Sequence, residues 1–243
     1  MIVAADYKAV EWQAALELCR DKVGIEEWNG WSRGKPDMHN FNQQKFNLPD
    51  RRIAKIFLFR LIYGGTEWSY SKDPDYNWIS DSPKFWRDMI DAFYEKYSGL
   101  HRWHGDLVRT VTKNGSLIIP TGRTYYFTPT RKRGELVWPR TQILNYPVQG
   151  FASEWVKVGR VVLLRLLRER LPQALFISSV HDSLVLDVPD SYVEDALKIL
   201  NDFVHTYTST TFSRLFGYSF AMPIRGEIFY GPNQKELTEW IPT

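Results

Sequence analysis

The stretch Phe176-Ile-Ser-Ser-Val-His-Asp-Ser-Leu-Val-Leu-Asp-Val188 decides the fold. Two short runs of apolar and β-branched residues, 176–180 and 184–188, flank the polar tripeptide His181-Asp182-Ser183, a pattern that predicts a tight β-hairpin within a sheet. An aspartate at such a tip is held rigidly, because the strands on either side fix its backbone. Most single carboxylates in turns are solvated turn residues, so Asp182 becomes informative only beside a second feature of the chain.

The start of the chain supplies that second feature. Met1-Ile-Val-Ala-Ala-Asp-Tyr7 reads as a short apolar strand that carries Asp6 near its end, and residues 8–20 read as a helix. Two such aspartates in one sheet would bind Mg²⁺, which needs few carboxylates because it also takes waters and substrate phosphates as ligands. Two cations bound there could clamp the attacking and leaving oxygens of a phosphoryl transfer.

Length and composition bound the class of protein. A chain of 243 residues, 44% hydrophobic and 24% charged, can bury the core of one domain with or without a subdomain. The formal net charge of +3 permits a nucleic-acid partner without requiring one. The single cysteine, Cys19, excludes a disulfide framework and a cysteine-based metal cluster. No apolar run reaches membrane-spanning length and no charged signal segment opens the chain, so we expect a cytoplasmic protein.

A second strong pattern is the helix predicted over residues 51–64, with Asp50 as its N-cap and Gly64-Gly65 as its stop. Every fourth position on one face carries a cation or an aromatic ring: Arg51, Lys55, Phe59 and Tyr63. Two cations followed by two rings would suit a triphosphate with a base stacked beyond it, since arginine forks onto phosphate oxygens. A solvated basic edge with aromatics facing a core is the alternative, and spacing alone favours it.

The rest of the chain alternates helices with short extended segments. The predicted elements are a loop (24–36), helices (82–112, 140–170, 191–215), a hairpin (114–127) and a last strand (222–230). Ser191 and Glu194 form a capping-box pattern at the start of the third of these helices. The basic loop Thr130-Arg-Lys-Arg-Gly134 fits a solvated turn and a contact with a phosphate backbone equally well.

Four motifs, in order over almost the whole chain, resemble the polymerase motifs of family A DNA polymerases, especially those of bacteriophages. They are Asp6-Tyr7 followed by Glu11, the Arg51-x3-Lys55-x3-Phe59-x3-Tyr63-Gly64 helix, Asn145-x3-Gln149-Gly150, and Val180-His181-Asp182. The resemblance implies an α+β fold with an antiparallel palm sheet flanked by helices, formed by residues 1–23 and 136–243. A mainly helical fingers subdomain, residues 24–135, would be inserted into the palm.

The resemblance also implies a role for each motif residue. Asp6, Asp182 and the Tyr7 backbone carbonyl would hold two Mg²⁺ ions, and Lys55 would act as the general acid toward pyrophosphate. Glu11 would be a sugar gate that fills the space needed by a ribose 2′-hydroxyl. Contacts with the incoming dNTP would come from Arg51, Lys55, Phe59, Tyr63 and His39. Contacts with the primer–template DNA would come from Arg140, Asn145, Gln149 and His181.

The chain also departs from the family pattern. Ser183 stands where a glutamate commonly follows the second aspartate, a change that some phage polymerases and single-subunit RNA polymerases carry. Leu58 and Arg60 replace the Asn and Gly usual in bacterial relatives. The thumb and 3′–5′ exonuclease domains that precede the first motif in the family are absent. We therefore expect one chain of a split phage polymerase, in an infected bacterial cell, whose partner chain supplies both domains and covers an apolar palm surface; an engineered fragment is the other interpretation.

Three functions remain open at this point. The first is a template-directed DNA polymerase that adds dNTPs to a primer 3′-hydroxyl by two-metal-ion nucleotidyl transfer. The second is a single-subunit RNA polymerase-like core. Such a core shares the motifs, but Glu11 would obstruct the binding of its ribonucleotide substrate. The third is a catalytically silent nucleic-acid-binding module, which would have no need for Asp6 and Asp182 together.

Overall fold

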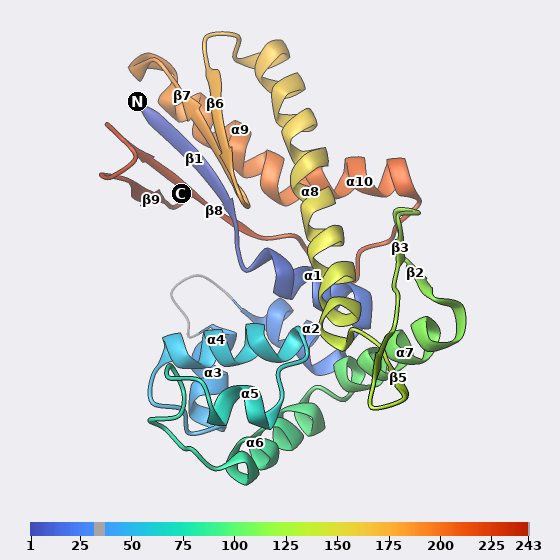
Figure 1. Cartoon of the computed structure of the whole chain (residues 1–243). Coiled ribbons are helices and arrows are strands. Elements are labelled where there is room, and N and C mark those ends of the chain that lie inside the picture. The colour runs from blue at the N-terminus through green and yellow to red at the C-terminus, as the bar shows by residue number, and fades with distance from the viewer. Residues whose placement is uncertain (32–36, 243) are drawn as a thin grey trace. The chain divides into compact units, whose positions relative to one another are not determined.

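The chain divides into two compact units, and their helices and strands are labelled in Figure 1. A computed structural model describes residues 1–31 and 37–242. Unit 1 comprises Met1–Gln13 and Gly150–Thr243, and unit 2 comprises Ala14–Gln149. The chain passes from one unit to the other at two points, and each point lies inside a helix, α1 (Val10–Cys19) or α8 (Arg140–Arg170). Within the described ranges, no helix is long and apolar enough to cross a membrane.

Unit 1 is built on a five-stranded antiparallel sheet with the strand order β6-β7-β1-β8-β9. Its strands are β1 (Ile2–Tyr7), β6 (Leu175–Val180), β7 (Ser183–Asp187), β8 (Gly226–Gly231) and β9 (Thr238–Trp240). The central strand β1 pairs with β7 on one side and β8 on the other, and its residues Val3, Ala4 and Ala5 are buried. Helix α9 (Val193–Asp202) packs against β1 and β8. The predicted α+β fold, an antiparallel sheet flanked by helices, is confirmed.

The β6–β7 hairpin forms with a tighter turn than the sequence predicts. Val180 pairs with Ser183, so the turn contains only His181 and Asp182, and Ser183 is the first residue of β7. His181 has φ 53°, a backbone region that non-glycine residues rarely adopt. Two-residue hairpin turns need a positive φ at their first position to match the strand twist. The short turn thus explains the unusual conformation of His181.

The helix predicted over 191–215 is present as one helical run over residues 193–216 with a π-helical turn in its middle. A 3-10 turn (Asp190–Tyr192) leads into α9, followed by a π-helical turn (Phe203–Tyr207) and α10 (Thr208–Phe216). The predicted capping box is wrong: Tyr192 precedes α9 and provides no side-chain cap. At the π turn the Phe203 carbonyl accepts a hydrogen bond from the Thr208 hydroxyl (3.0 Å). The predicted last strand shortens to β8.

Unit 2 is mainly helical. Its helices are α2 (Lys22–Gly30), α3 (Met38–Lys45), α4 (Arg51–Ile62), α5 (Glu67–Ser71), α6 (Pro83–Lys96) and α7 (Ser98–Asn114). Two separate hairpins follow, β2 (Ser116–Ile118) with β3 (Thr124–Tyr126), and β4 (Thr130–Lys132) with β5 (Glu135–Val137). The helices meet around fully buried rings, including Phe57, Tyr70, Trp86 and Phe93, with Tyr70 stacked on Trp86 at 5.0 Å. Buried aromatic contacts of this kind provide much of the stability of a core.

Two predicted boundaries in unit 2 are wrong, and both involve Asp21. Residues 24–30 of the predicted loop belong to α2, because one Asp21 oxygen caps this helix at the Gly24 N–H (2.9 Å). Positions 32–36 of the predicted loop lie outside the described residues. The helix predicted over 82–112 breaks at Tyr97 into α6 and α7. The other Asp21 oxygen accepts the N–H groups of Gly99 (2.7 Å) and Leu100 (3.2 Å). One buried carboxylate therefore caps two helices.

The single thiol of the chain is chemically protected. Cys19 ends α1, and its Sγ lies 3.8 Å from the Leu16 carbonyl oxygen. Burial raises the pKa of the Cys19 thiol to about 12, despite a hydrogen bond from the Asp21 backbone that lowers it. Because the thiolate is the reactive form of cysteine, the raised pKa makes this thiol slow to react at neutral pH.

Candidate active site

Asp6 lies near the end of β1, the central strand of the unit 1 sheet, between two polar neighbours. It pairs with Ser183 on β7 and with Glu227 on β8. Directly opposed residues on antiparallel strands point to the same face, with Cβ atoms about 4.5–5.5 Å apart. Asp182 precedes Ser183, and its carbonyl oxygen accepts a hydrogen bond from the Tyr7 N–H (3.2 Å). The structure therefore brings the two predicted metal-binding aspartates to the same end of the same sheet.

The Tyr7 side chain anchors the strand end that carries Asp6. Its ring is buried against Phe203, with centroids 6.0 Å apart, and its hydroxyl forms a 2.9 Å hydrogen bond with Thr208. Burial raises the pKa of Tyr7 well above its usual value, although the Thr208 hydrogen bond lowers it. Gly159 of α8 makes room for this hydroxyl, since a Cβ there would lie 2.5 Å from it. The side chain is thus structural, and only the Tyr7 backbone is available to a ligand.

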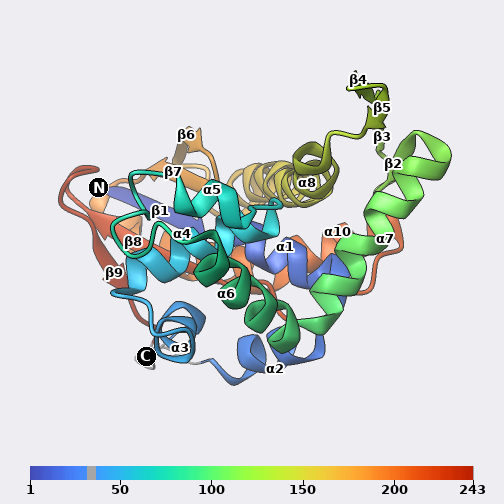
Figure 2. The ribbon, with the colours of Figure 1, turned by 60° about the horizontal axis from the view of Figure 1, so that its bottom comes forward.

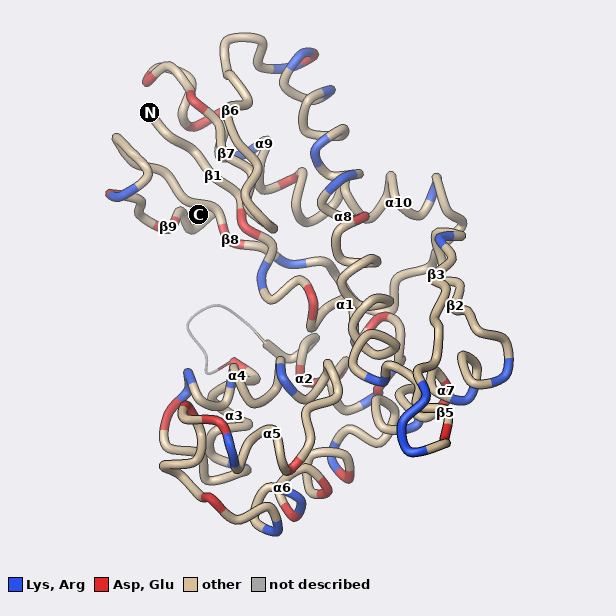
Figure 3. Tube along the Cα trace, in the orientation of Figure 1, with Lys and Arg blue, Asp and Glu red and all other residues tan. Residues whose placement is uncertain are grey.

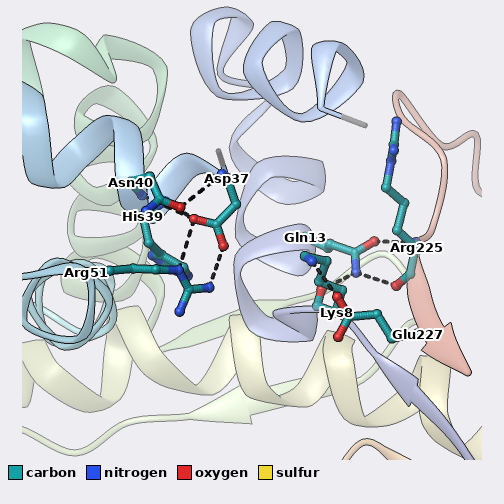
Figure 4. Close-up of polar contacts among 8 residues, drawn as sticks. All are labelled: Lys8, Gln13, Asp37, His39, Asn40, Arg51, Arg225 and Glu227. Atoms are coloured by element: carbon teal, nitrogen blue, oxygen red, sulfur yellow. Dashed lines mark hydrogen bonds and ion pairs between the residues drawn. The ribbon is translucent and has the colours of Figure 1, made fainter. Parts of the chain in front are cut away.

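A polar network around the β1–α1 connection was missed by the sequence reasoning (Figure 4). Lys8 Nζ lies 2.5 Å from Glu227 Oε1, which ties the strand end to β8. The buried Gln13 amide donates to the carbonyl oxygens of Lys8 (2.5 Å) and Arg225 (3.0 Å), and its oxygen accepts the Arg225 N–H (3.0 Å). Close packing adds to this, because a Cβ at Gly226 would lie 2.5 Å from the Asp6 carbonyl oxygen. The available signal was a polar Gln13 between the apolar residues of a helix.

Helix α4 presents the predicted stripe on its accessible face. Asp50 accepts the Ile53 N–H (2.8 Å) as N-cap, and Gly64, with φ 83°, lies just beyond the helix end, so both predicted ends are confirmed. Arg51 and Lys55 are exposed, whereas Phe59 and Tyr63 are half-buried. The opposite face is fully buried through Ile53, Ala54, Phe57, Leu58, Leu61 and Ile62. The buried residues of α4 therefore pack in the core of unit 2, and the stripe of Arg51, Lys55, Phe59 and Tyr63 stays accessible.

Helix α3 adds His39 to the stripe on α4. The His39 and Phe59 ring centroids are 6.2 Å apart, and Lys55 Nζ lies 5.8 Å from the centre of the Phe59 ring. His39 itself is buried. Three of the five residues predicted to contact a nucleotide are thus adjacent in unit 2.

Arg51 is held by a carboxylate from the start of α3 (Figure 4). Its Nη2 lies 2.5 Å from Asp37 Oδ2, and Asp37 also accepts the N–H groups of His39 and Asn40 as the N-cap of α3. Burial raises the pKa of the Asp37 carboxyl, but the hydrogen bonds from Arg51 and the Asn40 N–H outweigh it and hold that pKa below its usual value. Arg51 is therefore restrained by a charged partner that a phosphate could replace.

Polar residues line one face of the first turns of α8. Asn145 and Gln149 are one helical turn apart, and Gln142, which the sequence reasoning missed, lies on the same face. Gln142 and Gln149 are exposed, and Asn145 is half-buried. At about 100° per residue, Arg140 lies roughly on the opposite side of the helix from Asn145 and Gln149. The long helix predicted over 140–170 is confirmed, but its predicted DNA-contacting residues do not share one face.

The predicted site residues are divided between the units. Asp6, Tyr7, Glu11, His181 and Asp182 belong to unit 1, and the others belong to unit 2. Glu11 lies in the first turn of α1, and His181 is exposed at the hairpin turn. Over residues 1–31 and 37–242, no group of three or more His, Cys, Asp or Glu side chains is arranged to hold a metal ion. The predicted site instead has two aspartates and one backbone carbonyl, an oxygen donor set of the kind that Mg²⁺ prefers.

Comparison with known protein families assigns the chain. The sequence profile described as DNA polymerase family A matches residues 1–236. The chain belongs to the family A DNA polymerases. This family A polymerase chain is 21% identical over 238 residues to DNA polymerase I of Geobacillus stearothermophilus, and 23% identical over 245 residues to that of Chloroflexus aurantiacus. These alignments cover 96% and 97% of the chain but 26% and 24% of the relatives, so it spans about a quarter of their length.

A solved structure shares the fold of this family A chain. It is described as the POL domain of Pol1 from M. smegmatis in complex with DNA primer-template and dNTP. The TM-score is 0.77 at 19% identity, with 95% of this chain and 39% of the other covered. At this identity the likeness establishes a common fold.

Proposed function

We propose that this chain is the catalytic portion of a template-directed DNA polymerase, which adds dNTPs to a primer 3′-hydroxyl with release of pyrophosphate. The observation that carries the proposal is the pairing of β1 with β7. In this pairing Asp6 lies opposite Ser183, the residue that follows Asp182. Membership of the family supports it, because the relatives are DNA polymerases I.

Asp6, Asp182 and the Tyr7 backbone carbonyl are proposed to hold two Mg²⁺ ions. When bound, Mg²⁺ would lower the pKa of the primer 3′-hydroxyl and offset the charge that develops on the leaving pyrophosphate. The burial of Tyr7 and the Asp182–Tyr7 backbone hydrogen bond support this assignment, since they fix both strand ends before a substrate arrives. Ser183, in place of a glutamate, leaves the ligand geometry to the two aspartates.

The α4 stripe is proposed to bind the triphosphate, base and sugar of the dNTP. Arg51 and Lys55 would contact the phosphates, with Lys55 donating a proton to pyrophosphate as general acid. His39 would lie near the phosphates, Phe59 would pack against the sugar and base, and Tyr63 would stack at the template position. Arg51 would exchange Asp37 for a phosphate oxygen when the dNTP binds. The remaining proposed contacts, all with primer–template DNA, are Arg140, Asn145, Gln149 and His181.

The proposed palm is residues 1–23 and 136–243, and the proposed fingers are residues 24–135. We also propose a bacteriophage enzyme, active in an infected bacterial cell, that works together with a separate chain. Ser183 supports the phage type. Exposed apolar side chains in unit 1 would suit such a partner, among them Val161, Leu175, Ile177 and Val180. Co-purification of a second chain that no longer binds after Leu175→Glu and Ile177→Glu would support the proposal, and a chain that stays monomeric in its native source would contradict it.

Primer extension by the purified chain with Mg²⁺ and dNTPs tests the central proposal. Asp182→Ala should abolish extension, alone or with a lysate of the native source, because it removes a metal ligand. Asp187→Ala is the matched control, since Asp187 lies on the same hairpin and is exposed. Near-normal extension by Asp182→Ala would overturn the proposed mechanism.

A single-subunit RNA polymerase-like activity is the second candidate, favoured by Ser183 alone. Glu11 separates the two candidates, because a carboxylate at the sugar gate would exclude a ribonucleotide. Glu11→Ala should increase ribonucleotide incorporation in the primer-extension reaction, with Glu11→Asp as the conservative control. If Glu11→Ala discriminates between ribonucleotides and deoxynucleotides as the wild type does, Glu11 is not the sugar gate.

A further inference from the structure

The segment that reads as a basic loop is a β-hairpin that the proposed active site does not use. Strands β4 and β5 pair antiparallel, with Arg131 opposite Leu136 and Lys132 opposite Glu135. The two residues between the strands, Arg133 and Gly134, have φ 51° and 87°. Positive φ at both positions is the geometry of a type I′ turn, which matches the twist of a two-stranded ribbon.

This hairpin is exposed over its whole length. Every residue from Thr130 to Val137 is exposed, including Leu136 at 58%. It forms its own two-stranded sheet, separate from the other sheets. An isolated two-stranded ribbon gains little stability from burial, so folding of the core does not explain why the chain builds one here.

The base of the hairpin is fixed even though its tip is solvated. The chain enters after Phe127, which is buried in a cluster with Leu107, Val111, Leu117, Ile143 and Leu144. It leaves through Trp138, which packs against the same cluster. The charged tip is therefore carried on a ribbon anchored at both ends in unit 2.

Three consecutive cations occupy the tip (Figure 3). Arg131, Lys132 and Arg133 form no ion pair in the part of the chain that the structure describes. Elsewhere in unit 2, by contrast, Arg51, Arg60 and Arg87 each pair with a carboxylate at 2.5–2.7 Å. Because alternate residues of a strand point to opposite faces, Arg131 and Lys132 charge both faces of the ribbon. The hairpin is the segment labelled β4 and β5 beyond the end of α7 in Figure 2.

We propose that the β4–β5 hairpin is a DNA-binding arm whose Arg131, Lys132 and Arg133 contact the phosphodiester backbone. Arginine and lysine on an exposed, pre-formed ribbon can contact phosphates with little loss of backbone entropy. A two-stranded ribbon is also narrow enough for the major groove of a duplex. Such contacts carry no base specificity. The inference rests on the proposed function, because it assumes that DNA is the substrate.

The salt dependence of DNA binding tests this proposal directly. Each phosphate contact contributes about −0.9 to the slope of log K against log salt for a duplex, and about −0.7 for a single strand. The triple change Arg131→Ala, Lys132→Ala and Arg133→Ala should reduce the magnitude of that slope by about 2–3 and weaken binding roughly tenfold or more at low salt. Blunt duplex, primer–template and single-stranded probes, without Mg²⁺ or dNTP, show which strand provides the phosphates.

Matched variants distinguish the loss of specific hairpin contacts with DNA from the general effect of a lower positive charge. The triple change Lys72→Ala, Lys84→Ala and Arg87→Ala removes the same charge from α6 and from the residue after α5. It should leave the slope nearly unchanged. The exchange Arg131→Lys, Lys132→Arg and Arg133→Lys should restore most of the binding. An unchanged slope in the hairpin triple variant, or an equal change in the control, would overturn the proposal.

Failure of the proposed function gives a different result. Asp182→Ala should bind all probes with the wild-type salt slope, because the arm does not depend on catalysis. If that variant still extends primers, the catalytic assignment fails while the arm stands. If it is inactive but the hairpin variants bind normally, the arm fails while the catalytic assignment stands.

Discussion

Asp37 shows how one side chain can serve a helix and a proposed active-site residue together. It caps α3 through the N–H groups of His39 and Asn40, and it holds Arg51 at 2.5 Å. A nucleotide phosphate would have to displace it from Arg51. If Arg51 binds the phosphates as proposed, the resting ion pair lowers the affinity for dNTP by the free energy needed to separate Arg51 from Asp37.

Asp37→Asn should strengthen dNTP binding. Asparagine is an equally good N-cap, so α3 remains capped, while the charge that competes for Arg51 is removed. An exposed ion pair contributes about 0.2–1 kcal/mol, so the KM for dNTP should fall by up to about fivefold with kcat unchanged. Steady-state primer extension measures this, with Asp50→Asn at the start of α4 as control. A rise in KM would show instead that Asp37 positions Arg51 productively.

His104 is a buried imidazole that the fold keeps neutral. Its Nδ1 lies 3.0 Å from the Tyr94 hydroxyl. Burial, with smaller contributions from the charges of Arg140 and His101, lowers the pKa of His104 to about 3. Because the folded pKa lies below the unfolded one, the stabilising effect is complete above about pH 6.5 and is lost as the pH falls toward 3.

His104→Gln should make the protein less sensitive to mild acid. Between pH 7 and pH 5 the wild type should lose about 2 kcal/mol of unfolding free energy through this group. The variant should lose correspondingly less over the same interval, as measured by urea unfolding at both pH values. His101→Gln, at an exposed position of the same helix, should retain the wild-type loss. Equal losses in the wild type and His104→Gln would contradict the assignment.

Sequence reasoning at this scale succeeds where partners are close in the chain. The Asp50 cap and the four-residue spacing of Arg51, Lys55 and Phe59 depend on local geometry, and both are present in α4. The Lys8–Glu227 contact joins residues far apart in sequence, and its partner could not be found without the register of β1 and β8. The roles assigned to the site residues remain predictions.

At the scale of elements, helix ends decide where the predictions hold. The α2 segment was predicted as a loop because its glycine, asparagine and tryptophan content suggested one. The structure forms a helix there because Asp21 caps it and Trp28 is buried. Asp21 also accepts hydrogen bonds from N–H groups at the start of α7. This contact joins segments that are far apart in the sequence, so local composition could not predict it.

Asp21→Ala should destabilise the protein much more than Asp50→Ala. Asp21 is buried and accepts three N–H groups from two helices, whereas Asp50 is exposed and accepts one. Loss of an exposed cap costs about 1 kcal/mol, and leaving several buried N–H groups unpaired costs about 3 kcal/mol or more. Chemical denaturation of both variants measures the difference. Equal losses would mean that water replaces the Asp21 carboxylate.

At the scale of the whole molecule, both covalent connections between the units run through helices. One of them, α8, contains Pro147 two residues before the boundary at Gln149. Proline has no N–H, so the helical hydrogen bond to the carbonyl of residue 143 is missing at this point. The helix is therefore weakest close to the place where the chain passes from unit 2 to unit 1.

Pro147→Ala should give a more stable but slower enzyme. Alanine restores the missing hydrogen bond, and after allowance for the lost packing of the buried ring we expect a gain of about 1–2 kcal/mol. A stiffer α8 should lower kcat for primer extension if bending of this helix accompanies turnover. Thermal unfolding and single-turnover kinetics measure the two effects, with Arg165→Ala at an exposed position of α8 as control. A less stable variant would show that the surroundings are built for the proline ring.

The raised pKa of Cys19 has a practical consequence for spectroscopy. Because little of the native cysteine is thiolate at neutral pH, a cysteine introduced at an exposed position such as Thr130 would be modified by a maleimide dye much faster than Cys19. A single fluorophore could thus be attached at the base of the β4–β5 hairpin without first removing a native residue. Its emission would follow the approach of a quencher-labelled oligonucleotide in real time, in the unaltered catalytic background.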